Sequence, residues 1–187
     1  MNDPIAVLDA NILYSFYLRQ FFLRMSFEEK LFQARWSHKI NEEWTRNLAK
    51  KNPSFTLEKA QQAIAWMQTN FLGACVDFEE YMGPATSLKL PDKGDIHVVA
   101  AALACQASFI VTKNLQHFPV EVLENVGIEP IHPDDFTIKI ISDSPEQALA
   151  TIIRMAESYE KPKVSVSEMI AILAKNLPKS SNALKLL

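Results

Sequence analysis

The stretch IAVLDANILYS, residues 5 to 15, joins an apolar strand to an acid and then to the start of an apolar helix. The four apolar residues from Ile5 to Leu8 predict a strand buried on both faces, which is typical of the centre of a parallel sheet. Asp9 stands at the carboxyl end of this strand, where open parallel sheets bind their ligands. Asp9 therefore either caps the following helix or is the first member of a site.

Strand and helix patterns alternate as far as residue 131. The predicted strands cover residues 5–8, 31–36, 74–76, 108–111 and 128–131. The predicted helices cover residues 12–25, 38–50, 57–71, 98–104 and 119–125, with another starting near residue 78. This alternation predicts an α/β fold with a largely parallel central sheet flanked by helices.

The pattern changes after residue 132, where only helices are predicted. They cover residues 136–141, 145–158 and 166–177, and Ser165 and Glu168 have the spacing of a capping box. We therefore expect a main domain over residues 1–132 and a helical C-terminal domain over residues 133–187.

Composition narrows the class of protein. Of the 187 residues, 48% are hydrophobic and 22% charged, which is typical of a globular chain with a sizeable core. The net charge of −3 argues against a strongly basic nucleic-acid coat but allows a local basic groove. The longest apolar stretch, residues 98–105, is too short to span a bilayer, and an acidic N-terminus is unlike a signal peptide. Cys75 and Cys105 lack a CxxC spacing, so we expect reduced thiols in a cytoplasmic protein.

Two polar residues follow predicted strands from distant parts of the chain. Asp9 follows the first strand, and Asn114 follows the strand at residues 108–111 after a threonine and a lysine. The simpler explanations are a helix cap for Asp9 and an Asx turn for Asn114. Because parallel strands end at the same edge of a sheet, the pair also predicts a shared site.

The helix over residues 38–50 presents one acid to the border of the core. Its apolar stripe is Ile40, Trp44 and Leu48, spaced four residues apart. At about 100° per residue, Glu42 points away from this stripe, whereas Glu43 flanks it and can reach a cleft. The simpler explanation of Glu43 is a surface ion pair with a basic residue one turn later.

Two more acids precede the small-residue helix at residues 98–104. In PDKGD, Asp95 is the natural N-cap of that helix, and Asp92 lies in the loop before it. Together with the strand-end acid and Glu43, these residues can share one rim. Carboxylates about 4 Å apart repel by roughly 4 kcal/mol at an effective dielectric constant near 20, so a bound cation is the natural way to keep them together.

The ligand types indicate the metal and the chemistry. Oxygen ligands suit Mg²⁺ or Mn²⁺, whereas the four histidines are scattered along the sequence without a zinc motif. A divalent ion held by several acids fits phosphodiester hydrolysis, in which the ion activates water and neutralises phosphate charge. Another type of α/β phosphohydrolase would usually have a DxD motif after the first strand, and no GxGxxG motif supports a dinucleotide-binding enzyme.

Four segments, in this order, resemble the motifs of the PIN-domain ribonucleases, in particular the VapC-type toxins of bacterial toxin–antitoxin pairs. They are LDANILYS, SHKINEEWTRN, LPDKGDIHVVAAALA and IVTKNLQHFP. The resemblance covers about residues 1–132, and the helical tail resembles the C-terminal domain of one subgroup. It implies a PIN-like fold, Mg²⁺- or Mn²⁺-dependent endoribonuclease activity and neutralisation by a small antitoxin protein. Carried over by position, it implies Asp9, Glu43, Asp95 and Asn114 as catalytic residues.

One motif departs from the family pattern. Relatives often have LPDPDDRHV where this chain has LPDKGDIHV, so Gly94 replaces an acid and Ile96 replaces an arginine. The alternative function is therefore a catalytically weak or inactive PIN-like module that binds RNA or regulates.

The expected mechanism is in-line attack on an RNA phosphodiester by metal-activated water. We expect Asp9 and Asp95 to bind the metal, with Asp92 assisting at a second ion. Glu43 would bind the metal or orient water, and Asn114 would hold a bound water. The expected substrate contacts are Lys93, Lys113, Arg46, Asn11 and Thr112.

Two other features leave alternatives open. Trp36 and Trp44 can stack on unpaired bases, although core positions explain both better because Trp44 lies on the apolar stripe. An apolar face on the helix at residues 12–25 or on the tail can bind an antitoxin or form a homodimer.

Overall fold

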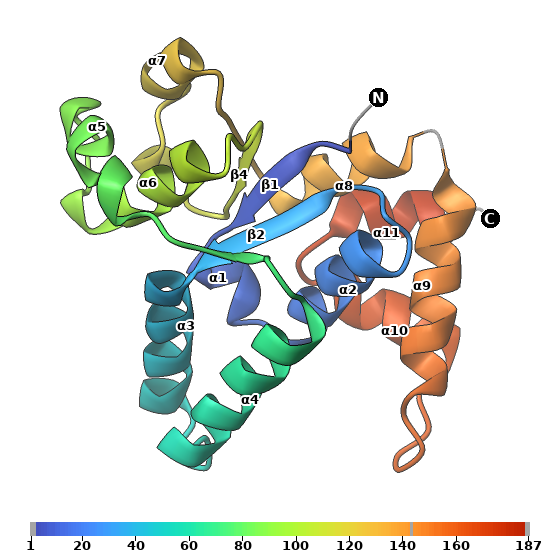
Figure 1. Cartoon of the computed structure of the whole chain (residues 1–187). Helices are drawn as coiled ribbons and strands as arrows, with labels where there is room; N and C mark the ends of the chain where they lie inside the picture. The colour runs from blue at the N-terminus through green and yellow to red at the C-terminus, as the bar shows by residue number, and fades with distance from the viewer. Residues whose placement is uncertain (1–2, 143, 186–187) are drawn as a thin grey trace.

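Five parallel strands form the centre of the molecule in the computed structural model, which describes residues 3–142 and 144–185. The strand order over these residues is β3-β2-β1-β4-β5, so β1 is central (Figure 1). The strands are β1 (Ile5–Leu8), β2 (Gln33–Ser37), β3 (Cys75–Val76), β4 (Phe109–Val111) and β5 (Glu129–Ile131). All four pairings are parallel, which confirms the predicted α/β class.

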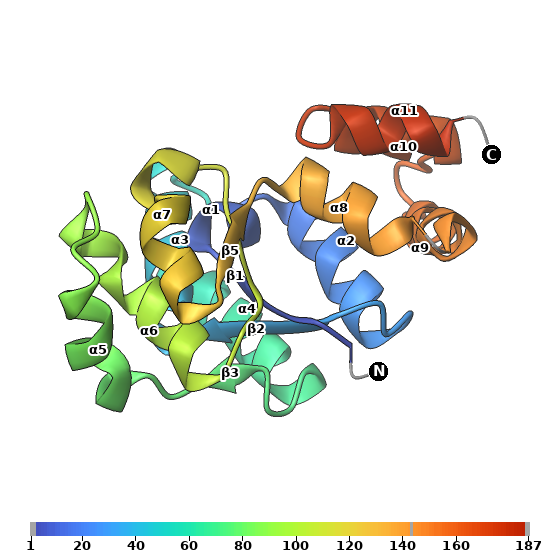
Figure 2. The same ribbon diagram turned by 90° about the horizontal axis from the view of Figure 1, so that it is seen from above.

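Helices cover both faces of this sheet. In sequence order they are α1 (Ala10–Leu13), α2 (Phe16–Phe27), α3 (His38–Lys51), α4 (Leu57–Asn70), α5 (Met82–Ser87), α6 (Ile96–Ala104), α7 (Val120–Leu123), α8 (Pro133–Ile141), α9 (Pro145–Glu157), α10 (Val166–Ala174) and α11 (Pro178–Leu184). Short 3-10 turns are η1 (Glu79–Tyr81), η2 (Lys93–Asp95), η3 (Leu115–His117) and η4 (Glu124–Val126). Figure 2 shows α5 to α7 on one side of the sheet and α2 with α8 to α11 on the other. Within the described residues, no helix is long and apolar enough to cross a membrane.

The helix starts follow the predicted caps. The Ser37 hydroxyl accepts a hydrogen bond from the backbone N–H of Ile40, and Thr56 caps α4 in the same way. Ser165 and Glu168 form the predicted capping box at the start of α10. These local signals were sufficient because the hydrogen-bond partners lie within three residues of each cap.

Several predicted elements differ in the structure, among them the helix predicted over residues 119–125, which is α7 followed by the 3-10 turn η4. The helix predicted over residues 12–25 is two helices, because the chain is extended at Ser15 between α1 and α2. The predicted loop before α6 contains the 3-10 turn η2. The helix predicted over residues 166–177 ends at Ala174, and α11 follows from Pro178, which cannot continue the preceding helix.

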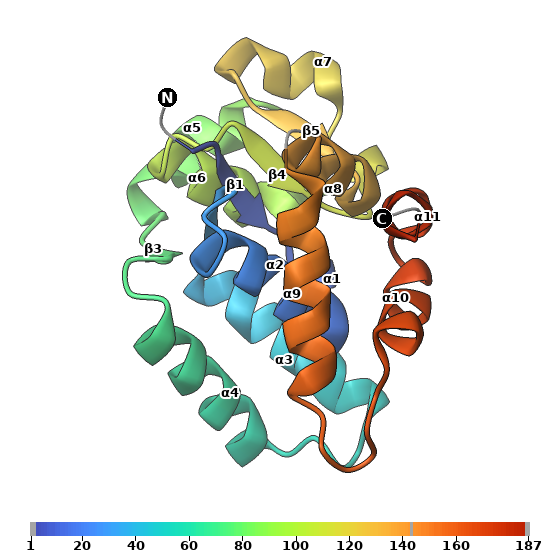
Figure 3. The ribbon, with the colours of Figure 1, turned by 90° about the vertical axis from the view of Figure 1, so that its right-hand side faces the viewer.

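The C-terminal helices share the core of the sheet domain. The ring of Phe136 on α8 lies 5.0 Å from that of Phe32 and 5.5 Å from that of Phe109. Helix α9 lies along α2, as Figure 3 shows, and Arg154 forms ion pairs with Glu28 and Glu29 at the end of α2. The C-terminal region is therefore packed on the main domain.

Both tryptophans considered for base stacking lie in the core. Trp36 and Trp44 are fully buried. The indole N–H of Trp44 donates a hydrogen bond to the Asn41 side chain. Neither ring can stack on a base in this conformation, as their apolar sequence context suggested.

Candidate metal centre

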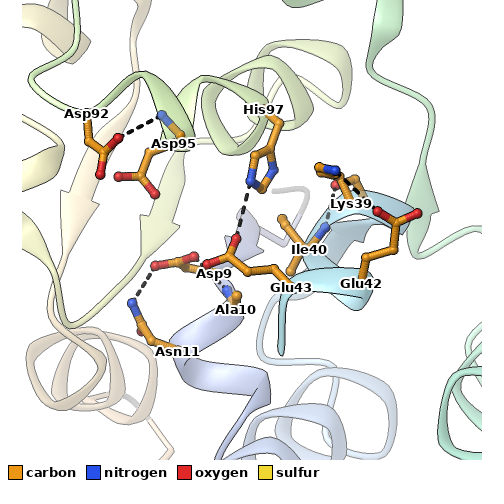
Figure 4. Close-up of polar contacts among 12 residues, drawn as sticks. Asp9, Ala10, Asn11, Lys39, Ile40, Glu42, Glu43, Asp92, Asp95 and His97 are labelled. Atoms are coloured by element: carbon orange, nitrogen blue, oxygen red, sulfur yellow. Dashed lines mark hydrogen bonds and ion pairs between the residues drawn. The ribbon is translucent and has the colours of Figure 1, made fainter. Parts of the chain in front are cut away.

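A cleft of about 460 Å³ opens at the carboxyl ends of β1 and β4. Asp9 directly follows β1, and Thr112 and Lys113 directly follow β4, so the adjacent parallel strands bring these residues to the same edge. All four residues predicted to be catalytic line the cleft: Asp9, Glu43, Asp95 and Asn114. In Figure 4 the carboxylates of Asp9, Glu43 and Asp95 face the same space.

Asp9 is held by a network that joins the two strand tips. Its Oδ1 accepts a hydrogen bond from the Ala10 backbone N–H at 2.6 Å, which makes it the cap of α1. Its Oδ2 accepts bonds from the Thr112 hydroxyl at 2.6 Å and the Asn11 side-chain amide at 2.5 Å. The side-chain Oδ1 of Asn11 accepts a hydrogen bond from the Lys113 backbone N–H at 3.1 Å. Two carboxylate oxygens have about four acceptor positions, so these three bonds leave capacity for a cation.

Burial makes the Asp9 charge unfavourable without a cation. Only 3% of Asp9 is exposed, and this burial is the main cause that raises its pKa from 3.8 to about 6. The Thr112 hydrogen bond opposes the shift, and the negative charges of Glu43 and Asp95 add to it. A divalent cation would reverse these effects, because it favours the ionised carboxylate.

Asp95 does not have the capping role that its position suggested. Its side chain makes no capping hydrogen bond to α6; instead, Oδ2 lies 2.8 Å from Nδ1 of His117. Burial raises the pKa of Asp95, and the contact with His117 opposes that shift. Asp92 caps the preceding 3-10 turn η2 instead, because its Oδ1 accepts a hydrogen bond from the Gly94 backbone N–H at 2.7 Å (Figure 4). The Asp95 carboxylate is thus available to the cleft.

Two histidines that looked scattered in the sequence lie beside these acids. Ligand atoms of Asp92, Asp95 and His117 lie within 4.8 Å of one another, which is compatible with a metal site. Nε2 of His97 lies 3.3 Å from Oε2 of Glu43. Both histidines belong to the motif segments, GDIHVV and NLQHFP, and that membership was the only signal available in the sequence.

The helical-wheel argument for α3 agrees with the structure. Glu42 is exposed and pairs with Lys39 at 3.3 Å, whereas Glu43 is partly buried at the cleft. No ion pair joins Glu43 to Arg46 among the described residues; His97 is its partner. The simpler explanation of Glu43 as half of a surface pair is therefore wrong.

The predicted substrate contacts lie in three different settings. Lys113 and Asn11 line the cleft, whereas Lys93 and Arg46 are exposed and lie outside its lining. Thr112 is fully buried, and its hydroxyl donates to Asp9 and accepts from the Asn11 side chain and the Asn114 backbone N–H. That hydroxyl has no bonding capacity left for RNA, so its position corrects the prediction of a direct contact. Two further basic residues beside the motif segments also line the cleft: Lys50 and Lys51.

The donor set fits Mg²⁺ or Mn²⁺ better than zinc. The groups at the rim are mainly carboxylate oxygens, with the imidazoles of His97 and His117 beside them, and Mn²⁺ and Mg²⁺ prefer oxygen-rich ligand sets. Burial is the main cause that raises the pKa values of Asp9 and Asp95, and the charges of neighbouring acids add to both shifts. The residues present therefore fit a divalent ion.

This fold and acidic rim define a class, and comparison with known families identifies it. The family described as "PIN domain" matches residues 6–116, so the chain belongs to the PIN-domain family. The family described as "VapC50 C-terminal domain" matches residues 133–186. The resemblance inferred from the four motifs is thereby confirmed.

A curated relative supports the same assignment. The protein named "Putative ribonuclease VapC50" from Mycobacterium tuberculosis (strain ATCC 25618 / H37Rv) is 36% identical over 84 residues. The match covers 45% of this chain and 50% of that protein, so it spans about half the length of the relative. No solved structure matches this chain.

Proposed function

We propose that this protein is a Mg²⁺- or Mn²⁺-dependent endoribonuclease that hydrolyses RNA phosphodiesters. The observation that carries the proposal is the convergence of Asp9, Glu43 and Asp95, from three separate elements, on one cleft. Their mutual repulsion contributes to the raised pKa of Asp9, which is the electrostatic situation that a divalent ion relieves. Membership of the PIN-domain family and the name of the curated relative support a ribonuclease.

In this proposal some rim residues bind the metal ion and others orient the attacking water. Asp9 and Asp95 would hold the ion, with Asp92 and His117 beside Asp95. A divalent ion there activates water and neutralises charge on the scissile phosphate. Glu43 uses Oε2 for His97, which leaves Oε1 to accept a hydrogen bond from the attacking water.

The remaining cleft residues bind and orient RNA. The Asn114 side chain makes no hydrogen bond among the described residues, so it can donate to a phosphate oxygen or to a bound water. Lys50, Lys51 and Lys113 supply positive charge within a chain of net charge −3. Each phosphate that they neutralise contributes a salt-dependent part of the affinity.

The test uses the purified full-length protein, structured RNA, and either Mn²⁺ or EDTA. We expect cleavage with Mn²⁺ and none with EDTA. Asp9→Asn, Asp95→Asn and Glu43→Gln should each lower kcat/KM by at least about 100-fold, since each removes several kcal/mol of charge stabilisation at the ion or the water. Glu42→Gln is the matched control because Glu42 is the exposed neighbour on the same helix.

The outcomes separate the candidate functions. Equal Mn²⁺-dependent cleavage by wild type and Asp9→Asn would refute the proposed mechanism. Salt-sensitive RNA binding without cleavage would instead support the PIN-like regulatory module. That alternative draws on Gly94: a Cβ at this position would lie 3.0 Å from Asp92 Oδ1, so the acid common in relatives would require Asp92 to move.

We further infer that the protein is the toxin of a type II toxin–antitoxin pair acting in the cytoplasm. The motif resemblance and the match to a VapC50 C-terminal domain support this assignment. The test is co-expression with the short neighbouring reading frame. Growth arrest by the nuclease alone and recovery with its neighbour would support the inference, whereas growth unaffected by the active nuclease would refute it.

A further inference from the structure

A side-chain hydrogen bond joins the helical C-terminal region to a residue of the cleft. The Lys113 Nζ donates a hydrogen bond to Oδ1 of Asn176 at 2.6 Å, across 63 positions of sequence. Lys113 lines the cleft beside Asp9, and Asn176 lies just after the end of α10. A residue of the helical C-terminal region thus binds the ammonium group of a lysine that lines the candidate active site.

Lys113 is fixed at both ends. Its backbone N–H donates to the Asn11 side chain, which also bonds to the Asp9 carboxylate. Lys113 is half-buried, and none of the ion pairs among the described residues includes it. Asn176 is therefore the partner that sets the direction of this side chain.

A neutral acceptor has a specific advantage in an acidic cleft. An ammonium group has three N–H donors, and the bond to Asn176 uses one of them without cancelling the charge. Two donors remain for phosphate oxygens. A free lysine chain at this rim would instead be attracted to the carboxylates of Asp9 or Glu43 and would compete with a divalent ion for them.

The corner that carries Asn176 is itself anchored to α8, whose Phe136 packs on the sheet domain. Leu177, the next residue, is 1% exposed. The buried carboxylate of Asp134 on α8 accepts hydrogen bonds from the backbone N–H groups of Lys179 and Ser180 and from the Ser180 hydroxyl. Helix α11 contacts α8, and Figure 2 shows these two helices side by side. A rigid corner lowers the entropic cost of holding Lys113 in one direction.

From this geometry we propose that Asn176 is a positioning residue for RNA binding: it aims Lys113 at a substrate phosphate, so the C-terminal helices complete the nuclease site. The proposal rests on the proposed ribonuclease function and deepens it. Lys113 makes the phosphate contact, and Asn176 acts only through Lys113.

The experiment measures RNA affinity as a function of salt, without divalent metal, so that cleavage does not interfere. Loss of the Lys113 contact should lower the slope of log K against log salt by about 0.7 for single-stranded RNA. Lys113→Ala should show this loss in full, and Asn176→Ala should lose part of it because the lysine is no longer held. The double variant should bind no more weakly than Lys113→Ala, because both changes remove one interaction.

Asn176→Asp separates positioning from simple support of the fold. Aspartate keeps an acceptor at the same place but cancels the Lys113 charge, so stability to urea should be retained while RNA affinity and the salt slope fall. Lys175→Asn is the matched control, because it changes the net charge by the same amount at the adjacent exposed position. It should leave the salt slope close to that of wild type.

In Mn²⁺-dependent cleavage, the Asn176 variants should raise KM more than they lower kcat, since the metal ligands are unchanged. Wild-type affinity and salt slope in both Asn176 variants would overturn the proposal, as would equal losses in Lys175→Asn or fully additive losses in the double variant. Failure of the wild-type protein to bind or cleave RNA at all would instead count against the proposed function.

Discussion

The ionised form of the Asp9 side chain is unfavourable when no metal ion is bound. Its pKa in the folded protein is about 6, against 3.8 when unperturbed, because the carboxyl group is buried. Between these two values the folded state binds more protons than the unfolded state, so the contribution to stability is full below pH 3.8 and is lost as pH rises through 6. This shift in pKa corresponds to a loss of about 3 kcal/mol in the free energy of unfolding once the pH is above 6.

We therefore predict that the EDTA-treated wild type loses stability relative to Asp9→Asn as pH rises from 4 to 7. The difference between their free energies of unfolding should change by up to about 3 kcal/mol. Urea unfolding at each pH measures it, and any constant cost of the substitution cancels. Excess Mn²⁺ should remove the pH dependence of the wild type, and a difference that stays flat with pH would show that Asp9 titrates normally.

Thr112, which directly follows the neighbouring strand β4, donates a hydrogen bond to the same carboxylate. Its hydroxyl lowers the pKa of Asp9, and it is fully buried. Thr112→Val should raise the pKa of Asp9 further, destabilise the protein at pH 7 by about 2 kcal/mol and shift the pH for half-maximal Mn²⁺ binding upward. Thr112→Ser keeps the hydroxyl and should bind Mn²⁺ like the wild type. Calorimetric titration between pH 5.5 and 8 distinguishes the two variants, and an equal response from both would refute a role for the hydroxyl.

Residues of the site were predictable where they follow local rules. Asp9 directly follows a strand, and Glu43 flanks the apolar stripe of a helix, so the location of both side chains at the cleft could be predicted from the sequence pattern. His117 and Asn176 had no such signal, because their partners, Asp95 and Lys113, are 22 and 63 positions away. Such contacts depend on tertiary packing, which a single sequence does not specify.

At the scale of elements, the first turn of α11 is capped by a side chain from another helix, α8. The cap residue Leu177 makes no side-chain hydrogen bond; Asp134 on α8 accepts three bonds from the first turn instead. This explains why α11 was not predicted: the sequence around residue 178 contains no local cap. The predicted caps Ser37, Thr56 and Ser165 all have their partners within the same element.

We predict that Asp134→Ala destabilises the protein by about 3 kcal/mol, because a buried carboxylate is removed and three donors lose their acceptor. Asp135→Ala is the matched control, since Asp135 is exposed and its partner is the Lys179 ammonium group. This control should change stability little. Urea unfolding compares the two variants, and equal effects would contradict the anchoring role of Asp134. RNA affinity should fall in Asp134→Ala as well, since the Asn176 corner loses its support.

At the scale of the whole molecule, the two family matches do not correspond to two separate cores. Residues of the PIN match and of the C-terminal match form one continuous cluster of buried side chains. Phe136, from the C-terminal match, packs between Phe32 and Phe109 of the sheet domain. The sequence marked the change from strands to helices after residue 132, but periodicity cannot show which helix faces complete the core of the other part.

A shared core predicts cooperative unfolding of the entire chain. Phe136 is fully buried, so Phe136→Ala should lower the free energy of unfolding by about 3–5 kcal/mol and shift a single transition. Ile138→Ala is the control on the same helix, because Ile138 is 37% exposed, and its effect should be much smaller. Urea unfolding followed in parallel by tryptophan fluorescence and far-ultraviolet circular dichroism makes the measurement, since Trp36, Trp44 and Trp66 all lie in the PIN match. If circular dichroism showed an early loss of helix in Phe136→Ala while fluorescence stayed at its wild-type midpoint, the C-terminal helices would be unfolding alone and the single-core interpretation would be wrong.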